Sequence, residues 1–92
     1  MNFDWDAGKA VSNLRKHGVA FVDAAMVFLD EGRIEIYDDR ENYGEDRWIV
    51  VGRVSKLILC VVYTVRQDDT TRIISARKAV RYEQKQYRQT NH

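Results

Sequence analysis

The stretch at residues 57–63 is apolar at every position, and it constrains the fold of this 92-residue chain more than any other feature. It is much shorter than the roughly 20 residues that a membrane-spanning helix needs. A short connection at Ser55-Lys56 joins the stretch to the segment before it, which favours an antiparallel hairpin of two strands. An antiparallel strand that is apolar on both sides needs cover on both faces of its sheet. We therefore expect helices, or a partner chain, on both sides of this strand.

The remaining patterns predict an α+β domain. Period-two alternation predicts strands at residues 3–5 and 33–37, and the segments between the polar turns predict strands at residues 47–54, 57–66 and 71–76. Helical spacing predicts helices at residues 7–17, 22–29 and 78–87. Asp6 is the expected N-cap of the first helix, and Gly18 is its expected end. The result is an antiparallel sheet of about four strands, with two N-terminal helices and one C-terminal helix.

The length and composition fit one domain. With 45% hydrophobic and 32% charged residues, we expect a single packed domain at residues 1–88 and a flexible tail at residues 89–92. The N-terminus has neither the basic nor the apolar region of a secretion signal, and no membrane contact is expected, so the predicted location is the cytoplasm. Cys60, the one cysteine, lies in the apolar stretch and is expected to be a buried thiol rather than a nucleophile.

The charges are sorted along the chain. Residues 23–46 carry nine acidic residues against two arginines, whereas residues 47–92 carry ten basic residues against three acidic ones. A basic half can attract a polyanion such as a nucleic acid. The acidic part either limits non-specific binding or meets a basic partner.

The densest basic segment spans the last strand and the last helix. Its basic residues are Arg72, Arg77, Lys78, Arg81, Lys85 and Arg88, and Glu83 is its one acid. Guanidinium groups match phosphate geometry, and phenol rings can stack on unpaired bases. The predicted RNA contacts are Arg72, Arg81, Lys85 and Tyr87. The alternative is a solvated helix face with its tyrosines in the core, and the pattern favours neither.

Arg77 and Lys78 are expected where the last strand passes into the last helix. A helix N-terminus attracts anions, whereas basic residues in the first turn of a helix oppose its dipole. A bound phosphate would relieve that conflict. Arg66 ends the neighbouring strand and could converge on the same point, although an arginine at a strand end is more often simply solvated.

His17 is the main candidate for proton transfer. Histidine is the side chain whose ordinary pKa lies nearest neutrality. The commoner role of a histidine in a last helical turn is to complement the helix dipole. Glu45, Glu83 and Tyr87 are the other candidate proton acceptors.

No metal or cofactor is expected. The acidic cluster Asp38, Asp39, Glu41, Glu45 and Asp46 lacks the fixed spacing of a calcium-binding loop. The chain also lacks zinc-binding Cys/His spacing, a Gly-rich nucleotide loop and a Gly-x-Ser-x-Gly motif. These absences argue against a conventional metabolic enzyme.

Two sets of residues, which together cover almost the whole chain, resemble BrnT toxins. The first set is Phe3-x-Trp5-Asp6-x3-Ala10-x2-Asn13-Leu14-x-Lys16-His17-Gly18-Val19-x-Phe21, followed by Ala24-Ala25-x-Val27-Phe28-x-Asp30. The second set is Tyr43-Gly44-Glu45-x-Arg47-Trp48-Ile49-x-x-Gly52, then Val61-Val62-Tyr63-Thr64-x-Arg66, then Arg72-Ile73-Ile74-Ser75-Ala76-Arg77-Lys78-Ala79-x3-Glu83-x3-Tyr87. Each piece is weak alone, but the set is specific.

The resemblance implies a RelE-like fold and a toxin that cleaves RNA without a metal. It also implies neutralisation by a DNA-binding antitoxin, BrnA, in a hetero-oligomer, so that operator DNA is contacted only through the antitoxin. The basic positions of that family match Arg66, Arg77 and Lys78, and recurrent polar positions match His17 and Glu83. These five residues are the expected catalytic set.

Two other functions remain open from the sequence. The chain could be a non-catalytic RNA- or DNA-binding module, which the basic segment would serve equally well. It could also be a protein that only binds an antitoxin-like repressor. Growth arrest on expression of the chain alone would separate an active toxin from both.

Overall fold

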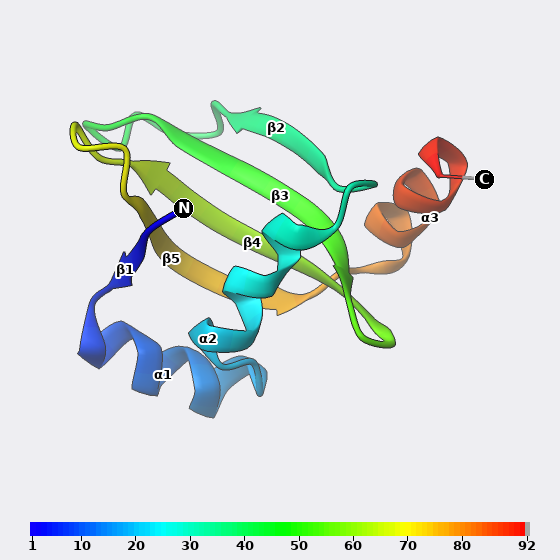
Figure 1. Ribbon diagram of the computed structural model, residues 1–92, viewed down its shortest axis with the longest axis horizontal. Coiled ribbons are helices and arrows are strands. Elements are labelled where there is room, and N and C mark those ends of the chain that lie inside the picture. Colours follow the sequence, from blue (N-terminus) through cyan, green and yellow to red (C-terminus); the bar gives the residue numbers. More distant parts are fainter. Residues whose placement is uncertain (92) are drawn as a thin grey trace.

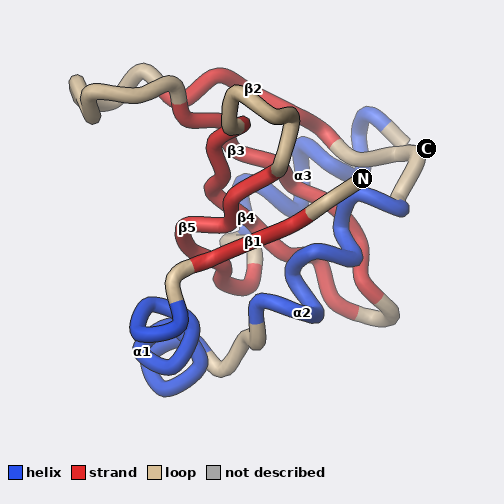
Figure 2. Tube along the Cα trace, turned by 60° about the vertical axis from the view of Figure 1, so that its left-hand side comes forward, coloured by secondary structure: helices blue, strands red, loops and turns tan. Residues whose placement is uncertain are grey.

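The computed structural model, which describes residues 1–91, is a five-stranded sheet with helices on both faces (Figure 1). The strands are β1 (Phe3–Trp5), β2 (Ile34–Asp38), β3 (Arg47–Val54), β4 (Leu57–Val65) and β5 (Thr71–Lys78). Their order in the sheet is β1-β5-β4-β3-β2. The four long strands pair antiparallel, and β1 adds to β5 in parallel. Figure 2 shows the strands in red, with β1 leading from the N-terminus towards α1. The predicted α+β fold is therefore confirmed, with β1 extending the sheet at one edge.

The helices are α1 (Ala7–His17), α2 (Phe21–Ala24), the 3₁₀ helix η1 (Ala25–Leu29) and α3 (Arg81–Thr90). The first helix begins and ends as predicted, because Asp6 accepts a hydrogen bond from the Lys9 amide and Gly18 adopts a left-handed conformation. The predicted helix at residues 22–29 is instead a single α turn followed by η1. Among residues 1–91, no helix is long and apolar enough to cross a bilayer.

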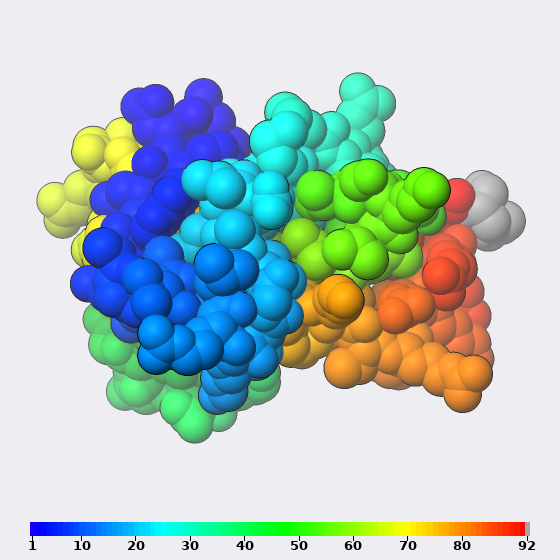
Figure 3. Space-filling model, turned by 90° about the horizontal axis from the view of Figure 1, so that it is seen from below, coloured from blue at the N-terminus to red at the C-terminus, as the bar shows by residue number. Residues whose placement is uncertain are grey.

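The apolar strand β4 is covered on both faces, as its sequence predicts. Leu59, Val61 and Tyr63 pack on one face in the main core, which α1, α2 and η1 cover. Cys60 lies on the opposite face in a smaller cluster with Tyr87 of α3. In Figure 3, α3, in orange and red, lies at the opposite end of the molecule from α1, in blue. Because α3 covers only part of the second face, the rest of that face is left for a site.

The last helix begins later than predicted. Lys78 pairs with Leu59 in the sheet, and the Ala79 amide donates to the Ile58 carbonyl, so β5 continues where the helix was expected at residues 78–87. The helix then extends through Thr90, and the Asn91 side chain donates to the Gly32 carbonyl at 2.8 Å. The described part of the expected tail at residues 89–92 is thus mostly helical and held against the body. His92 lies outside the described residues.

A β-bulge in β5 sets the direction of its second half. Tyr63 of β4 pairs with Ile73, but Val62, the residue before it, pairs with Ser75, so Ile74 is an extra residue. Without that extra residue, strict alternation would point Arg77 at the main core together with Ile73. The bulge moves Ser75 and Arg77 to the other face, because a bulge re-aims the side chains that follow it.

Candidate active site

A cavity of about 200 Å³ opens on the face of the sheet that α3 covers only in part. It collects residues from α1, the β2–β3 loop, β3, β4, β5 and α3. The lining residues are His17, Arg40, Ile49, Cys60, Val62, Ser75, Ala76, Arg77 and Glu83. Three of the five predicted catalytic residues, His17, Arg77 and Glu83, therefore meet at one place.

Glu83 holds Arg77 at the cavity wall through two parallel hydrogen bonds. The Nη1 and Nη2 atoms of Arg77 donate to the two carboxylate oxygens of Glu83 at 2.7 and 2.9 Å. Glu83 also accepts a bond from the Val80 amide at 2.9 Å, in the first turn of α3. The predicted conflict of Arg77 and Lys78 with the helix dipole is wrong, because both residues belong to β5 and the first turn of α3 carries the acid Glu83.

This pairing decides the protonation of Glu83. The bonds from Arg77 lower the pKa of the Glu83 carboxyl below its ordinary value, against the opposing effect of burial. A carboxylate with a lowered pKa is a weak proton acceptor. The geometry therefore favours Glu83 as the residue that orients Arg77 rather than as a general base.

The lowered pKa of Glu83 predicts a specific loss of stability in acid. Because the pKa of Glu83 is lower in the folded chain, the Arg77–Glu83 pair contributes its full stabilisation of the fold above the ordinary pKa of 4.5. This contribution is lost as the pH falls through the folded pKa. In Glu83→Gln, the free energy of unfolding should be lower than that of the wild type at pH 7, and the gap should narrow towards pH 3. Denaturant titrations across this range measure the effect. Glu31→Gln, at an exposed position, is the control, and a gap that does not narrow would contradict the prediction.

His17 reaches the cavity from the end of α1 because Asn13, one turn earlier, fastens that helix to β5. Asn13 is 7% exposed, and its side chain donates to the carbonyls of Val19 and Ala76 at 2.9 and 2.8 Å. It also accepts from the Ala76 amide at 3.0 Å. Since Ala76 precedes Arg77, these bonds fix the position of His17 relative to Arg77.

Asn13→Ala should destabilise the fold by about 2–4 kcal/mol, because it leaves buried amide and carbonyl groups without partners. The groups affected are the Ala76 amide and carbonyl and the Val19 carbonyl. Denaturant unfolding measures the loss. Ser12→Ala, on the exposed side of the same helix, is the matched control and should change stability little. Equal stability of the two variants would show that Asn13 does not hold α1 on β5.

Cys60 lies at the floor of the cavity as a protonated thiol. Burial, followed by the negative charge of Glu83, raises the pKa of Cys60 to about 11. The thiolate, the nucleophilic form, is therefore scarce near neutral pH. The prediction that Cys60 is buried is confirmed, since it is 3% exposed.

Arg66 and Lys78 do not join the cavity. Antiparallel pairing places the end of β4 beside the start of β5, where Val65 faces Thr71, so Arg66 lies at the far end from Arg77. Cys60 and Arg66 are six positions apart, which is about 20 Å along an extended chain. Lys78 is exposed and alternates to the opposite face from Arg77. The convergence of Arg66 on Arg77, which the sequence allowed, therefore does not occur.

The predicted RNA contacts are dispersed. Tyr87 is 5% exposed, and its hydroxyl donates to Asp30 at 2.6 Å, so it is a core residue and cannot stack on a base. Arg72 pairs with Asp4 at 3.3 Å near β1. Arg81 and Lys85 are exposed and line a shallow hollow on α3 with Arg88 and Gln89. Of the predicted RNA contacts, only Arg81 and Lys85, together with Arg88, form the exposed basic surface on α3 that the sequence predicted.

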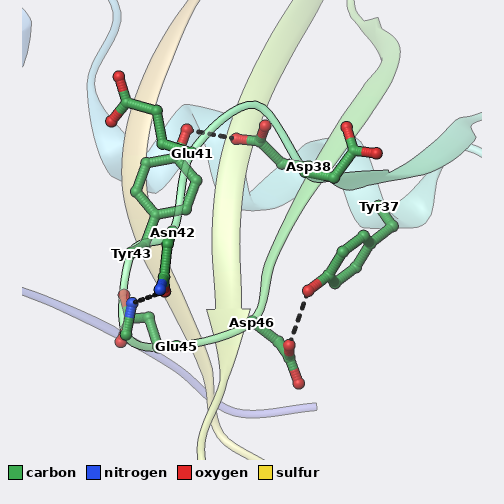
Figure 4. Close-up of a pocket in the computed structure, with 9 residues that line it drawn as sticks. Tyr37, Asp38, Glu41, Asn42, Tyr43, Glu45 and Asp46 are labelled. Carbon is green, nitrogen blue, oxygen red and sulfur yellow. Dashed lines mark hydrogen bonds between the residues drawn. The ribbon is translucent and has the colours of Figure 1, made fainter.

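The acidic loop forms a separate hollow (Figure 4). Its side chains bond mostly with one another: the Tyr43 hydroxyl donates to Asp38 at 3.3 Å, and the Tyr37 hydroxyl donates to Asp46 at 2.8 Å. No group of three or more metal-ligating side chains is assembled within residues 1–91. The negative charge of this hollow would repel RNA, so we place the candidate active site at the His17–Arg77 cavity.

Residues 5–83 match the family model that describes BrnT, the ribonuclease toxin of type II toxin–antitoxin systems. The chain belongs to the BrnT family. A similar solved structure is the crystal structure of the Brucella abortus ribonuclease toxin, BrnT. It has a TM-score of 0.68 and 25% identity over 88% of this chain and 99% of that one. No curated protein sequence matches the chain.

Two residues that shape this site of the BrnT chain were not predicted from its sequence as site residues: Arg40, which lines the cavity, and Asn13, which lies outside the lining and holds α1 on β5. Asn13 is in the resemblance to BrnT toxins, but its burial at a helix position four residues before His17 becomes visible only in the structure. Arg40 is the one basic residue between Asp38 and Asp46, and its position among acidic residues could have marked it as a candidate site residue. Neither residue lies in the basic segment on which the sequence prediction was built.

Proposed function

We propose that this BrnT chain is an endoribonuclease that cleaves RNA without a metal ion, at the cavity between His17 and Arg77. The observation that carries the proposal is the meeting in one cavity of an imidazole and a guanidinium fixed by a carboxylate. Phosphoryl transfer requires proton movement and stabilisation of charge on the phosphate oxygens, and these two groups supply both functions.

In the proposed reaction the 2′-hydroxyl of a ribose attacks the adjacent phosphorus. A bond forms between phosphorus and the 2′-oxygen, and the bond from phosphorus to the 5′-oxygen of the next nucleotide breaks. His17 takes the proton from the 2′-hydroxyl while water protonates the leaving 5′-oxygen, or His17 protonates the leaving 5′-oxygen while water takes the 2′ proton. Arg77 stabilises the negative charge that develops on the phosphate oxygens. Glu83 orients Arg77, while Arg66 and Lys78 lie outside the cavity and have no assigned chemical step.

A second proposed RNA contact is the exposed stripe of Arg81, Lys85 and Arg88 on α3. Helical geometry places this stripe on the side of α3 away from Glu83, so it is a surface apart from the cavity. Such a stripe can contact the backbone of a flanking single strand without reading its sequence. RNA binding should therefore weaken as salt concentration rises.

The proposed partner is a DNA-binding antitoxin similar to BrnA, which would neutralise the toxin in a hetero-oligomer in the cytoplasm. Membership of a type II toxin–antitoxin family supports a protein antitoxin. Operator DNA would then be bound through the antitoxin and not by this chain. Co-purification with the antitoxin, followed by operator binding with and without it, tests this assignment.

The decisive test combines cleavage and growth. The purified chain should cleave RNA in excess EDTA, and its expression alone should arrest growth. Cleavage that appears only after Mg²⁺ is added would overturn the metal-free mechanism. Salt-sensitive RNA binding without any product, and without growth arrest, would instead identify a non-catalytic RNA-binding module.

A further inference from the structure

The cavity has a second guanidinium, supplied by the acidic loop. Arg40 lines the same cavity as Arg77 and is held by Asp38, at the end of β2. The Nε and Nη2 atoms of Arg40 donate to the two carboxylate oxygens of Asp38 at 2.7 and 2.8 Å. Both arginines of the cavity are thus held by a carboxylate through two hydrogen bonds, Arg77 through Nη1 and Nη2 and Arg40 through Nε and Nη2.

Asp38 is a firm anchor for Arg40. It is 3% exposed, and its hydrogen bonds from Arg40 lower its pKa to about 2, although burial acts in the opposite direction. The carboxylate is therefore charged at any pH near neutrality. A guanidinium has five N–H donors, so two bonds to Asp38 leave others for a further ligand.

The remainder of the loop is tied in place around this anchor. The guanidinium of Arg47 lies 4.1 Å from the ring centre of Tyr43, whose hydroxyl donates to Asp38 (Figure 4). The Asn42 side chain accepts from the Gly44 amide at 3.1 Å. These contacts fix the path of the loop, so the place of Arg40 at the cavity does not depend on the Asp38 pair alone.

The two guanidinium groups repel one another across the cavity. The charge of Arg40 acts to lower the pKa of Arg77, against the larger effect of Glu83. Asp38 and Glu83 each balance one of these charges, so a bound anion would add hydrogen bonds to the guanidinium N–H donors that the two carboxylates leave over. Phosphate accepts bonds from several guanidinium groups at once, which makes it the ligand that suits this pair. If the Arg40–Asp38 pair served stability alone, Arg40 would not need to line the same cavity as Arg77.

We propose that Arg40 and Arg77 together form a phosphate-binding site, in which Arg40 is a further substrate-binding residue that holds the RNA phosphodiester in the cavity. The part of this inference that concerns RNA rests on the proposed function. The binding of phosphate does not, because it requires only the two guanidinium groups. Arg40 would also be the point where an otherwise repulsive loop attracts the substrate.

The test titrates inorganic phosphate into the ¹⁵N-labelled protein and follows the Nε–H signals of the arginines by NMR. In the wild type, the Arg40 and Arg77 signals should shift and saturate together. In Arg40→Gln, the Arg77 signal should need at least about tenfold more phosphate, as expected for the loss of one charge-assisted contact. Arg15→Gln removes one exposed positive charge and should match the wild type. Absence of saturation in the wild type, or equal phosphate affinity of the two variants, would overturn the inference.

A second variant guards against an effect on folding. Arg40→Lys keeps the charge beside Asp38 but lacks the planar fork, so its phosphate affinity should fall between those of the wild type and Arg40→Gln. A thermal melt reports whether each variant is folded. Arg40→Lys with the affinity of the wild type would contradict a role for two-bonded geometry.

RNA cleavage then separates this inference from the proposed function. Arg40→Gln should raise KM for a short RNA by about tenfold or more and lower kcat less, since Arg40 binds the substrate before reaction. The wild type could bind phosphate and cut no RNA, with phosphate binding weakened in Arg40→Gln. That result would support the phosphate site and overturn the proposed ribonuclease function. Cleavage by the wild type with no change in KM or phosphate affinity in Arg40→Gln would overturn the present inference alone.

Discussion

Arg77→Gln should lower kcat/KM for RNA cleavage by about 10²–10³-fold, the usual cost of removing one preorganised donor from a transition state. Glu83 positions Arg77 before any substrate arrives, because the Nη1 and Nη2 atoms of Arg77 donate to the Glu83 carboxylate at 2.7 and 2.9 Å. Its charge therefore needs little reorganisation when negative charge develops on the phosphate. The loss should fall mainly on kcat, since a transition-state interaction is removed.

The neighbouring residue provides the control for Arg77. Lys78→Gln removes the same charge one position along the strand, but its side chain is exposed on the other face of the sheet. Cleavage by Lys78→Gln should stay within a few-fold of the wild type. If Lys78→Gln were as inactive as Arg77→Gln, the active site could not be the cavity described above.

His17→Gln should lower kcat by about 10²–10⁴-fold, the range for the loss of a positioned acid or base. Because glutamine can neither take nor give a proton, the pH–rate profile of the variant should also differ from that of the wild type. The fold should be retained, since Asn13 and not His17 fastens α1 to β5. Measurement of kcat from pH 5 to 9 for both proteins tests the prediction.

Lys16→Gln is the control for His17, because it changes an exposed residue in the same helical turn. It should leave the pH–rate profile unchanged. A His17→Gln enzyme with full activity and an unaltered profile would assign proton transfer to another group. Reduced activity with an unaltered profile would indicate that His17 only binds the RNA.

Local chemistry made part of the fold predictable. The Asp6 cap, the Gly18 end and the apolar strand each depend on residues close together in sequence, and all three are confirmed. Cover on both faces of β4 followed from its composition, because an apolar strand cannot leave either face in water. The parallel partner of β5 did not follow, since Phe3–Trp5 pairs with residues far along the chain.

The candidate site was predictable only in part, because it depends on tertiary geometry. His17, Arg77 and Glu83 were identified by residue type and by resemblance, but Arg66 was placed with them although antiparallel pairing separates it. The bulge at Ile74 reverses the side on which Arg77 emerges, and alternation in the sequence does not reveal a bulge. Arg40 enters the cavity through a loop whose acidic composition pointed away from RNA.

The hydrogen bonds between Asn13 and Ala76 have a consequence for the life of the chain as it is synthesised. They join residues 63 positions apart, so Ala76 of β5 must lie beside α1 before they form. Contacts this distant in sequence form late in folding, after the closure of the intervening loop. A nascent or prematurely ended chain therefore has its imidazole but no matching guanidinium. We expect such fragments to cleave no RNA, so that the proposed activity begins only once β5 is in place.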